Sequence, residues 1–432
     1  MNPIDANAKL TRTEIESIQL KRMKELLVRV YENVPFYHES FDNAGFDPYS
    51  FSSLDEMVNV PFTVKQDLRD AYPFGMFAVP LSDVARVHAS SGTSGKATVV
   101  GYTNDDITMW SECFARAMRA GNLDEHAIAQ IAFGYGLFTG GFGATDGARL
   151  LGATVVPMGS GNTKRQLQIM KDFGVTVLAC TPSYAVLIAD TAYELGYDPK
   201  TDFKLEIAIV GAEPSSHSLR REIEEKLDCK VLDIYGLSEV MGPGVACECL
   251  EQNGMHVCED YFYVEVVDPE TGLPVPDGEF GELVFTSLKK DCSPVIRYRT
   301  KDISRILTGS CPCGSTHRRI DYIQGRADDM LIIRGVNVFP SHIEEVILGF
   351  KEVSPYYELV VSRKGAMDSV MLRVEPSESF QIDEMGTIVN LQNRIKNELK
   401  SVLQIAVDVK LVEPNSIERS TGKSNRIVDL RN

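Results

Sequence analysis

Basic residues are in short supply in this sequence. Lysine and arginine together number 44 against 61 aspartates and glutamates, which gives a formal net charge of −17. A chain this acidic is repelled by nucleic-acid backbones and by anionic membrane surfaces, so neither is expected as a partner. An anionic ligand would have to be held by local devices such as backbone N–H groups, a helix N-terminus and a few placed cations.

Long apolar runs are also missing. No stretch approaches the roughly 18 apolar residues that a membrane helix requires. The opening residues MNPIDANAKLTRTE lack the apolar core of a signal peptide. Hydrophobic residues make up 44% and charged residues 24%, which is ordinary for a soluble globular protein. We therefore expect a cytoplasmic protein, whose 432 residues suffice for two or three compact units.

The nine cysteines are distributed unevenly. Cys113, Cys180, Cys229 and Cys292 are scattered, and we expect them to be small buried apolar side chains in a reducing cytosol. The other five fall in two tight groups that need a separate explanation: Cys247, Cys249 and Cys258, and Cys311 with Cys313.

Short β-rich runs alternate with amphipathic segments from about Val84 onward. Each run is followed by Gly, Ser or Pro and then by apolar residues at helical spacing. Near-continuous apolar strands separated by helices predict a mostly parallel sheet that is covered on both faces. The predicted strands lie within residues 128–135, 152–158, 174–181, 205–212 and 229–236.

The flanking regions have other patterns. Residues 10–37 carry apolar side chains at helical spacing, which predicts a surface helix. After about residue 255, DYFYVEVVDPETG and GEFGELVFTSL are typical of antiparallel strands, with DPETG as a turn. Beyond about Asp328, strand-like segments surround a helix that opens with Pro340 and another over residues 388–401.

The predicted fold class is α/β with two domains. Residues 1–327 should form a large multi-sheet N-terminal domain with mostly parallel sheets plus an antiparallel sub-barrel. Residues 328–432 should form a small mobile α+β C-terminal lid domain. We place the boundary in GRADD (325–329), because a hinge needs polar, exposed residues that can absorb a large backbone rotation.

The segment HASSGTSGKATVVGYT (88–103) predicts a phosphate-binding loop. Its small residues let backbone N–H groups face a polyphosphate, and Lys96 adds positive charge. It is not a Walker A loop, because Ser90 stands where the first glycine is needed and Ala97 replaces the metal-binding Ser or Thr. Taken alone, the segment could equally be a flexible turn without a ligand.

A second glycine-rich segment, GYGLFTGGFG (134–143), nearly matches a dinucleotide-binding fingerprint. Its spacing is G-x-G-x-x-x-G, however, so we reject a Rossmann interpretation. Turn and packing glycines are the alternative there.

Several separated segments together resemble adenylate-forming enzymes. SSGTSGK resembles their phosphate loop, and GAEP (211–214) with DIYGLSE (233–239) resembles their adenine-binding segments. YRTKD (298–302), GRADDMLIIRG (325–335) and STGKSNR (420–426) resemble the ribose, hinge and catalytic-lysine motifs, and all six occur in the family's order. The longer segments YGLSEVMGPGVACEC, PVIRYRTKDISR and GRADDMLIIRGVNVFPSHIEEV are similar to phenylacetate–coenzyme A ligases, and the resemblance covers essentially the whole chain.

The resemblance implies a role for each matching residue. Glu239 would hold Mg²⁺, a hard cation suited to carboxylate and phosphate oxygens. Asp302 would accept hydrogen bonds from both ribose hydroxyls, and Arg326 would hold the ribose and a phosphate. Lys423 would neutralise charge growing on the α-phosphate and carboxylate oxygens. The phosphates would be cradled by Ser90, Ser91, Gly92, Thr93, Ser94, Gly95 and Lys96; the adenine segment would comprise Gly211, Ala212, Glu213, Pro214, Asp233, Gly236, Leu237 and Ser238, with Tyr235 stacking on the base.

The same resemblance implies a two-step reaction. A carboxylate would attack the α-phosphorus of ATP and expel pyrophosphate, and the thiol of coenzyme A would then attack the acyl-adenylate and release AMP. Between the steps the small domain would rotate about Asp328, and Gly335 would leave room for the pantetheine arm. The acid would be an aryl acid, phenylacetate first, in a pocket formed by Tyr135, Gly136, Phe138, Gly140 and Gly141.

Two other functions stay open from the sequence. The chain could pass another carboxylic acid to a carrier protein or other acceptor, although it has no carrier domain of its own. It could also be a non-catalytic nucleotide-binding regulator, which intact Lys423, Glu239 and Asp302 argue against. The expected partners are therefore the small-molecule acid, ATP and coenzyme A, and homodimerisation stays open.

The clustered cysteines predict a structural zinc knuckle. Cys311 and Cys313 form a C-x-C turn, and together with Cys249 and His256 they would supply the closed tetrahedral set of a structural zinc site. The spacing is tighter than the common C-x₂₋₄-C. Free thiols on a surface turn are the alternative, and other residues compete as ligands: Cys247, Cys258 and His317.

Overall fold

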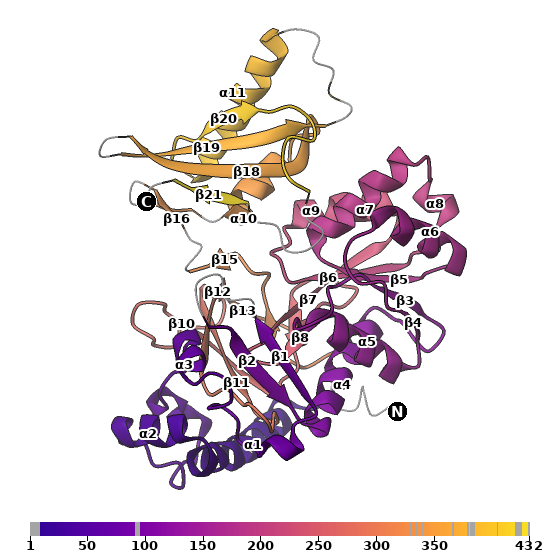
Figure 1. Ribbon diagram of the computed structural model, residues 1–432. Coiled ribbons are helices and arrows are strands. Elements are labelled where there is room, and N and C mark those ends of the chain that lie inside the picture. Colours follow the sequence, from indigo (N-terminus) through magenta and orange to yellow (C-terminus); the bar gives the residue numbers. More distant parts are fainter. Residues whose placement is uncertain are drawn as a thin grey trace.

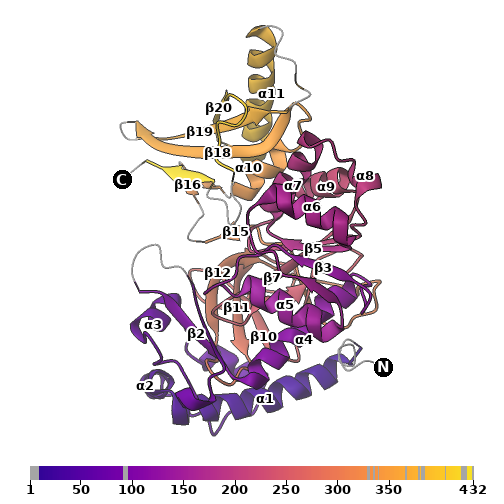
Figure 2. The ribbon, with the colours of Figure 1, turned by 45° about the vertical axis from the view of Figure 1, so that its right-hand side comes forward.

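A computed structural model describes residues 9–90, 96–327, 331–333, 336–338, 340–364, 367–377, 380, 385–403, 405–419 and 426–430. The chain forms a large part, from indigo to salmon in Figure 1, and a small orange-to-yellow part that lies against one end of it. The helices of the N-terminus lie at the opposite end of the large part (Figure 2). The expected α/β fold class with a small C-terminal domain is confirmed.

A nine-stranded mixed sheet organises the large part within the described residues. Its order is β13-β14-β9-β8-β7-β6-β5-β3-β4. Neighbours from β7 to β4 are parallel, as the sequence predicts, whereas β8, β9, β14 and β13 extend the sheet in antiparallel fashion. The strands are β3 (Ile128–Ile131), β4 (Thr154–Val156), β5 (Val177–Cys180), β6 (Ile207–Gly211), β7 (Lys230–Leu237), β8 (Gly242–Cys247), β9 (Met255–Val257), β13 (Ile306–Leu307) and β14 (Arg319–Ile320).

Helices cover both faces of the parallel half, as expected for strands that are apolar on both sides. Ala179 of β5 belongs to one buried cluster with Phe114 and Ala144. The adjacent Leu178 points the other way, into a second cluster with Tyr184. The helices are α4 (Asn104–Ala120) and α5 (Gly140–Leu151) on the first face, and α6 (Thr163–Phe173), α7 (Pro182–Glu194) and α9 (His217–Leu227) on the second, with the short α8 (Pro199–Asp202) beside them.

A second, antiparallel sheet has the order β10-β11-β12-β15. The pairing of β10 with β11 confirms the predicted antiparallel strands, and Asp268 Oδ1 accepts hydrogen bonds from the backbone of the DPETG turn. A separate hairpin, β1 with β2, flanks the predicted phosphate loop. The strands are β10 (Phe262–Val267), β11 (Gly281–Ser287), β12 (Tyr298–Ser304), β15 (Gly325–Arg326), β1 (Arg86–Ser90) and β2 (Thr98–Tyr102).

The N-terminal helices pack on this antiparallel region. The predicted helix over residues 10–37 is divided into α1 (Arg12–Asn33) and α2 (Pro35–Ala44). Val34 is extended between them because a residue that precedes proline disfavours the helical region. One face of α1, including Met23 and Leu27, is buried in the largest core cluster. The other elements of this region are η2 (Leu54–Asn59), α3 (Lys65–Asp70) and η3 (Leu81–Asp83).

The small domain has its own sheet and core. The sheet has the order β20-β19-β18-β21, and a separate hairpin joins β16 to β17. Ile343, Leu359 and Ile395 lie in its buried cluster. Its elements are β16 (Leu331–Ile333), β17 (Val336–Val338), α10 (Pro340–Ile347), β18 (Val353–Lys364), β19 (Met367–Pro376), α11 (Met385–Leu403), β20 (Asp408–Leu411) and β21 (Ile427–Asp429). Among the helices of the described residues, none is both long and apolar enough to span a membrane.

Candidate active site and metal cluster

The predicted ribose residues, Asp302 and Arg326, meet Tyr235, which we predicted to stack on the adenine, between the two sheets of the large domain. The hydroxyl of Tyr235, on β7, donates a hydrogen bond of 2.7 Å to Asp302 Oδ2 on β12. Arg326 of β15 pairs with Asp302 in register, and its Nη1 lies 3.5 Å from Asp302 Oδ1. Burial and the neighbouring Asp302 raise the pKa of Tyr235 far above its usual value, so the phenol keeps its proton and remains a donor. The arrangement presents a carboxylate, a phenol and a guanidinium at one place.

Glu239 follows β7 and lies next to a lysine from the N-terminal region. Its side chain is buried, with the residue 5% exposed. Lys65, the first residue of α3, places its Nζ 3.3 Å from Glu239 Oε1. Sequence reasoning missed Lys65, because a lysine at the start of a short helix carries no motif of its own.

The predicted adenine segment lies at the carboxyl ends of β6 and β7, where ligands of open α/β sheets bind. Gly211 ends β6, and Ala212 adopts a left-handed backbone conformation with φ 71°. Glu213 Oε2 accepts a hydrogen bond of 3.2 Å from the backbone N–H of Ser183. Gly236 and Leu237 are the last residues of β7.

Asp233 is in a different environment from the rest of that segment. It is buried beside Glu248, which accepts a hydrogen bond from the Asp233 backbone N–H and forms an ion pair of 2.5 Å with Arg220. Burial, with a further contribution from Glu248, raises the pKa of the Asp233 carboxyl to about 7. Asp233 therefore holds its proton more tightly than an exposed aspartate does.

Both ends of the predicted phosphate loop are held by the β1–β2 hairpin. Ser90 ends β1 and pairs with Thr98 of β2. The Ser90 and Thr98 hydroxyl oxygens are buried and have no hydrogen-bond partner within the part of the chain that the structure describes. Lys96 Nζ lies 5.8 Å from the centroid of the Tyr72 ring. Ser91, Gly92, Thr93, Ser94 and Gly95 lie outside the described residues.

Three further predicted residues, Lys423, Asp328 and Gly335, also lie outside the described residues. The described chain resumes at Arg426, directly before β21. Arg426 forms an ion pair with Glu344 of α10.

An aromatic cluster lies behind the predicted acyl pocket. Tyr135 packs edge-on against Phe142 with ring centroids 5.3 Å apart, and Phe142 packs against His88 at 5.5 Å. His88 in turn contacts Trp110 and Tyr102 edge-on, and those two rings stack 5.0 Å apart. Sequence reasoning found Tyr135 but missed the rings that extend the cluster, because they come from four different elements.

Glycines allow the backbone to approach the Trp110 indole. A Cβ on Gly143 would lie 2.3 Å from Trp110 Cζ2, and one on Gly242 would lie 2.4 Å from the same atom. Gly140 and Gly141 begin α5, and Gly136 precedes it. Phe138, which we predicted to line the pocket, is 52% exposed and lies on the surface.

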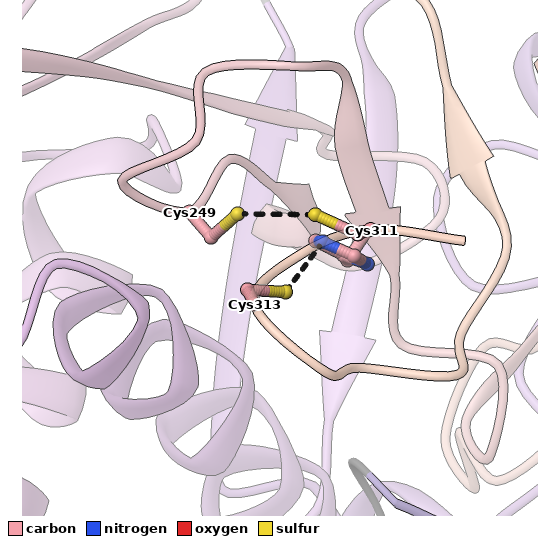
Figure 3. Close-up of side chains that lie close together, drawn as sticks. Cys249, Cys311 and Cys313 are labelled. Carbon is pink, nitrogen blue, oxygen red and sulfur yellow. Dashed lines mark hydrogen bonds between the residues drawn. The ribbon is translucent and has the colours of Figure 1, made fainter. Parts of the chain in front are cut away.

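The four predicted metal ligands come together (Figure 3). Cys249 Sγ lies 3.7 Å from Cys311 Sγ, and Cys313 Sγ lies 3.4 Å from His256 Nε2. All four ligand atoms lie within 4.8 Å of one another. Tetrahedral thiolates at the usual Zn–S distance lie about 3.8 Å apart, so the spacing suits a zinc ion.

The electrostatics of this cluster fit a cation. Burial lowers the pKa of His256 to about 4, so its imidazole is neutral, which is the form that binds metals. Burial raises the pKa of the Cys249 thiol to about 12. A dication would reverse that shift, because it stabilises thiolates directly.

The competing ligands have other partners. His317 Nδ1 lies 3.7 Å from Glu259 Oε2, and the Cys258 thiol donates to the carbonyl oxygen of Gly244 at 3.5 Å. Cys247 lies opposite His256 in the pairing of β8 with β9, and its side chain is buried among the apolar side chains that cover the sheet. The geometry thus favours Cys249, His256, Cys311 and Cys313.

The chain matches known families over most of its length. Residues 40–288 match the AMP-binding enzyme family, and residues 335–431 match the AMP-binding enzyme C-terminal domain. A phenylacetate–coenzyme A ligase of Escherichia coli (strain K12) is 49% identical over 97% of this chain and 95% of its own. One of Thermus thermophilus is 46% identical over 98% of both chains.

Solved structures of another CoA ligase share the fold over nearly the whole chain. The 2-hydroxyisobutyryl-CoA ligase in the postadenylation state, in complex with R3-HIB-AMP, has a TM-score of 0.94 at 30% identity, covering 100% of this chain and 94% of its own. The same ligase with 2-HIB-AMP and CoA in the thioesterification state has a TM-score of 0.73 at 31% identity, covering 98% of this chain and 91% of its own. The placement of the small domain in this chain therefore matches the postadenylation structure. The chain belongs to the AMP-binding enzyme family and, within it, to the phenylacetate–coenzyme A ligases.

Proposed function

We propose that this chain is an AMP-forming ligase that converts an aryl carboxylic acid, with phenylacetate preferred, into its coenzyme A thioester. The proposal is carried by the convergence of Tyr235, Asp302 and Arg326 in a chain 49% identical to a phenylacetate–coenzyme A ligase. That trio can hold a ribose and its phosphate: the carboxylate accepts from hydroxyls, and the guanidinium pairs with an anion.

In the first half-reaction a carboxylate oxygen bonds to the α-phosphorus of ATP, and the bond to the β-phosphate oxygen breaks. The protein's part is to position the reactants and to balance charge. Residues 90–96 supply small side chains and Lys96 to the departing phosphates. Lys423 balances the charge on the α-phosphate and carboxylate oxygens.

Glu239 fits the role of a magnesium ligand. It is a buried carboxylate, an oxygen ligand of the kind that Mg²⁺ prefers, and its partner in this structure, Lys65, is a cation whose place Mg²⁺ would take. Mg²⁺ bound there supplies charge neutralisation for the phosphate oxygens.

In the second half-reaction the coenzyme A sulfur bonds to the acyl carbon, and the bond to the AMP oxygen breaks. No protein nucleophile is required. We assign the hinge to Asp328, between domains of residues 1–327 and 328–432. Gly335 then comes near the site, where the lack of a side chain leaves room for the narrow pantetheine arm.

The aryl pocket is assigned to Tyr135, Gly136, Gly140 and Gly141, backed by the aromatic cluster around Phe142. Flat rings packed edge to face suit an aromatic substrate, and full burial of a ring contributes a few kcal/mol of binding free energy. Phe138 stays part of the proposed pocket, with its ring on the exposed side.

A structural zinc ion is part of the proposal. The loop between β13 and β14 carries Cys311 and Cys313, and its sequence TGSCPCGSTH has few apolar side chains to fix its conformation. Four ligands without an open position are typical of structural rather than catalytic zinc. The cluster contains none of the residues assigned to ATP.

The function is tested by two assays on the purified chain. Pyrophosphate exchange into ATP should depend on added phenylacetate, and the thioester should form with free coenzyme A. Exchange without thioester formation would favour transfer to a carrier protein. Absence of acid-dependent exchange with aryl, indolyl and medium-chain acids alike would contradict a ligase and favour a nucleotide-binding regulator.

A further inference from the structure

A buried carboxylate lies between the two domains. Glu344, on α10 of the small domain, is 4% exposed. Its Oε1 accepts a hydrogen bond of 3.1 Å from Ser216 Oγ of the large domain. Its Oε2 accepts one of 3.2 Å from the Tyr357 hydroxyl and pairs with Arg426, both within the small domain. Glu344 thus contacts both domains through its two oxygens.

The partners of Glu344 adjoin the two segments assigned to adenylation. Ser216 is the N-cap of α9, where its hydroxyl accepts from Leu219 N–H, and it follows the adenine segment by two residues. Arg426 ends the motif that contains Lys423. Its carbonyl oxygen accepts a hydrogen bond of 2.8 Å from the Leu359 N–H of β18, which fixes the start of β21.

Other polar contacts between the domains are less buried. Glu345 Oε1 accepts from Ser218 Oγ at 3.0 Å, and its side chain is exposed. The Tyr356 hydroxyl donates to Asp190 Oδ2 at 2.8 Å on the α7 side. A buried carboxylate that loses a partner is costly, so the Glu344 contact is the one with the larger effect on domain placement.

We propose that Glu344 is a positioning residue for adenylate formation: it links the adenine segment to the catalytic-lysine segment and holds the small domain in the arrangement seen here. The inference rests on the proposed function, including rotation of the small domain between half-reactions. That arrangement matches the postadenylation structure, with a TM-score of 0.94, better than the thioesterification structure, with 0.73. On rotation the Ser216 contact breaks, whereas those to Tyr357 and Arg426 move with the small domain.

Glu344→Gln should therefore slow adenylation selectively. In single turnovers we expect acyl-adenylate formation to fall about tenfold or more, since the amide carries no charge: the ion pair with Arg426 is lost and the hydrogen bond from Ser216 becomes a weaker neutral one. Thiolysis of supplied acyl-adenylate by coenzyme A should change less than about twofold or become faster, because that step needs the contact broken.

Two further variants separate positioning from folding. Ser216→Gly removes the hydroxyl from both the Glu344 contact and the α9 cap, but glycine is nearly as good an N-cap as serine. It should reproduce the split between the half-reactions at a nearly unchanged melting temperature. Glu345→Gln is the matched control and should leave both half-reactions within about twofold. The inference is overturned if Glu344→Gln and Ser216→Gly slow both half-reactions equally, or if neither variant slows adenylation. In both cases the activity of the parent protein would still support the proposed function. A parent with neither half-reaction overturns both.

Discussion

Lys65 Nζ lies 3.3 Å from Glu239 Oε1, which joins a short N-terminal helix to the residue assigned to magnesium. A cation at this place can balance the phosphates once they bind beside Glu239. We therefore expect the Lys65–Glu239 ion pair to affect the rate of the first half-reaction, in which the acyl-adenylate forms.

Lys65→Met should lower acid-dependent pyrophosphate exchange about 10- to 100-fold, because one charge beside the phosphates is lost. Lys65→Arg should recover part of the rate, since it keeps the charge. Gln66→Ala, on the same helix, whose side-chain amide donates to Asp70, is the control. Unchanged exchange in Lys65→Met would mean that the ion pair is only structural.

Lys423→Ala should separate the two half-reactions. Acid-dependent ATP consumption should fall by about 100-fold or more, because charge on the α-phosphate and carboxylate is no longer balanced. Thiolysis of a supplied acyl-adenylate should be largely spared, since another face of the small domain serves that step. Lys400→Ala in the last turn of α11 is the control, and equal losses in both steps would contradict the rotation of the small domain.

The aryl pocket can be tested by measuring substrate preference in the parent protein and in a variant with one glycine replaced. Phenylacetate or a close aryl acid should exceed acetate and palmitate at least ~10-fold in kcat/KM, because a buried ring adds a few kcal/mol. Gly143→Ala should reduce that preference, since its Cβ would lie 2.3 Å from the Trp110 ring and must displace it. Gly134→Ala is the matched control, as its nearest neighbour would be Ser160 Oγ at 3.8 Å. A parent that prefers a straight-chain acid would contradict the assignment.

The metal cluster should contain about one zinc ion per chain in protein purified without added metal. Cys311→Ser combined with Cys313→Ser should remove the zinc and lower the melting temperature. Ligase activity should remain measurable, because binding free energy at a structural site is local folding free energy. His317→Ala and Cys229→Ser, outside the cluster, should keep the metal. A parent without zinc, or a double variant with as much as the parent, would rule the site out.

Lys290 predicts a pH dependence of stability. Its ammonium is fully buried over the Tyr102 ring, 4.6 Å from the centroid, and has no hydrogen-bond partner within the described residues. Burial lowers its pKa to about 8, against about 10.4 in an unfolded chain. Between these two pKa values the unfolded state binds more protons than the folded state, so the destabilisation caused by buried Lys290 decreases as the pH rises. Below pH 8 the burial of the charged ammonium costs on the order of 3 kcal/mol of folding free energy.

Lys290→Met should therefore raise the free energy of unfolding at pH 7, and the gain should shrink as the pH rises from 8 to about 10. Lys289→Met, exposed and next in sequence, should show neither effect. Denaturant unfolding at several pH values measures both variants. A gain independent of pH would mean that Lys290 keeps an ordinary pKa.

The parallel half of the main sheet could be predicted because each strand carries its signal locally. Val177–Cys180 and Ile207–Gly211 are short apolar runs bounded by turn residues, and both are strands. The convergence of Cys249, His256, Cys311 and Cys313 could also be predicted, since Cys311 and Cys313 lie two positions apart and the set of zinc-binding residue types is small.

Features made by tertiary contact could not be predicted. Lys65 and Glu239 are 174 residues apart, and neither sequence environment indicates the other. The same holds for Glu344 and Ser216. The antiparallel extension by β8 and β9 was missed for a different reason: the short run Met255–Val257 is a strand only because β8 and β14 flank it.

The nine-stranded sheet ends in very short strands on both sides: β13 spans Ile306–Leu307, and β4 spans Thr154–Val156. A long, flat outer strand offers a row of unpaired backbone groups onto which a strand of another molecule can add, and short outer strands offer few. The loop with Cys311 and Cys313 connects β13 to β14 at one of these borders. The short terminal strands thus leave few backbone groups at either border of the sheet onto which a second molecule could add a strand in concentrated solution.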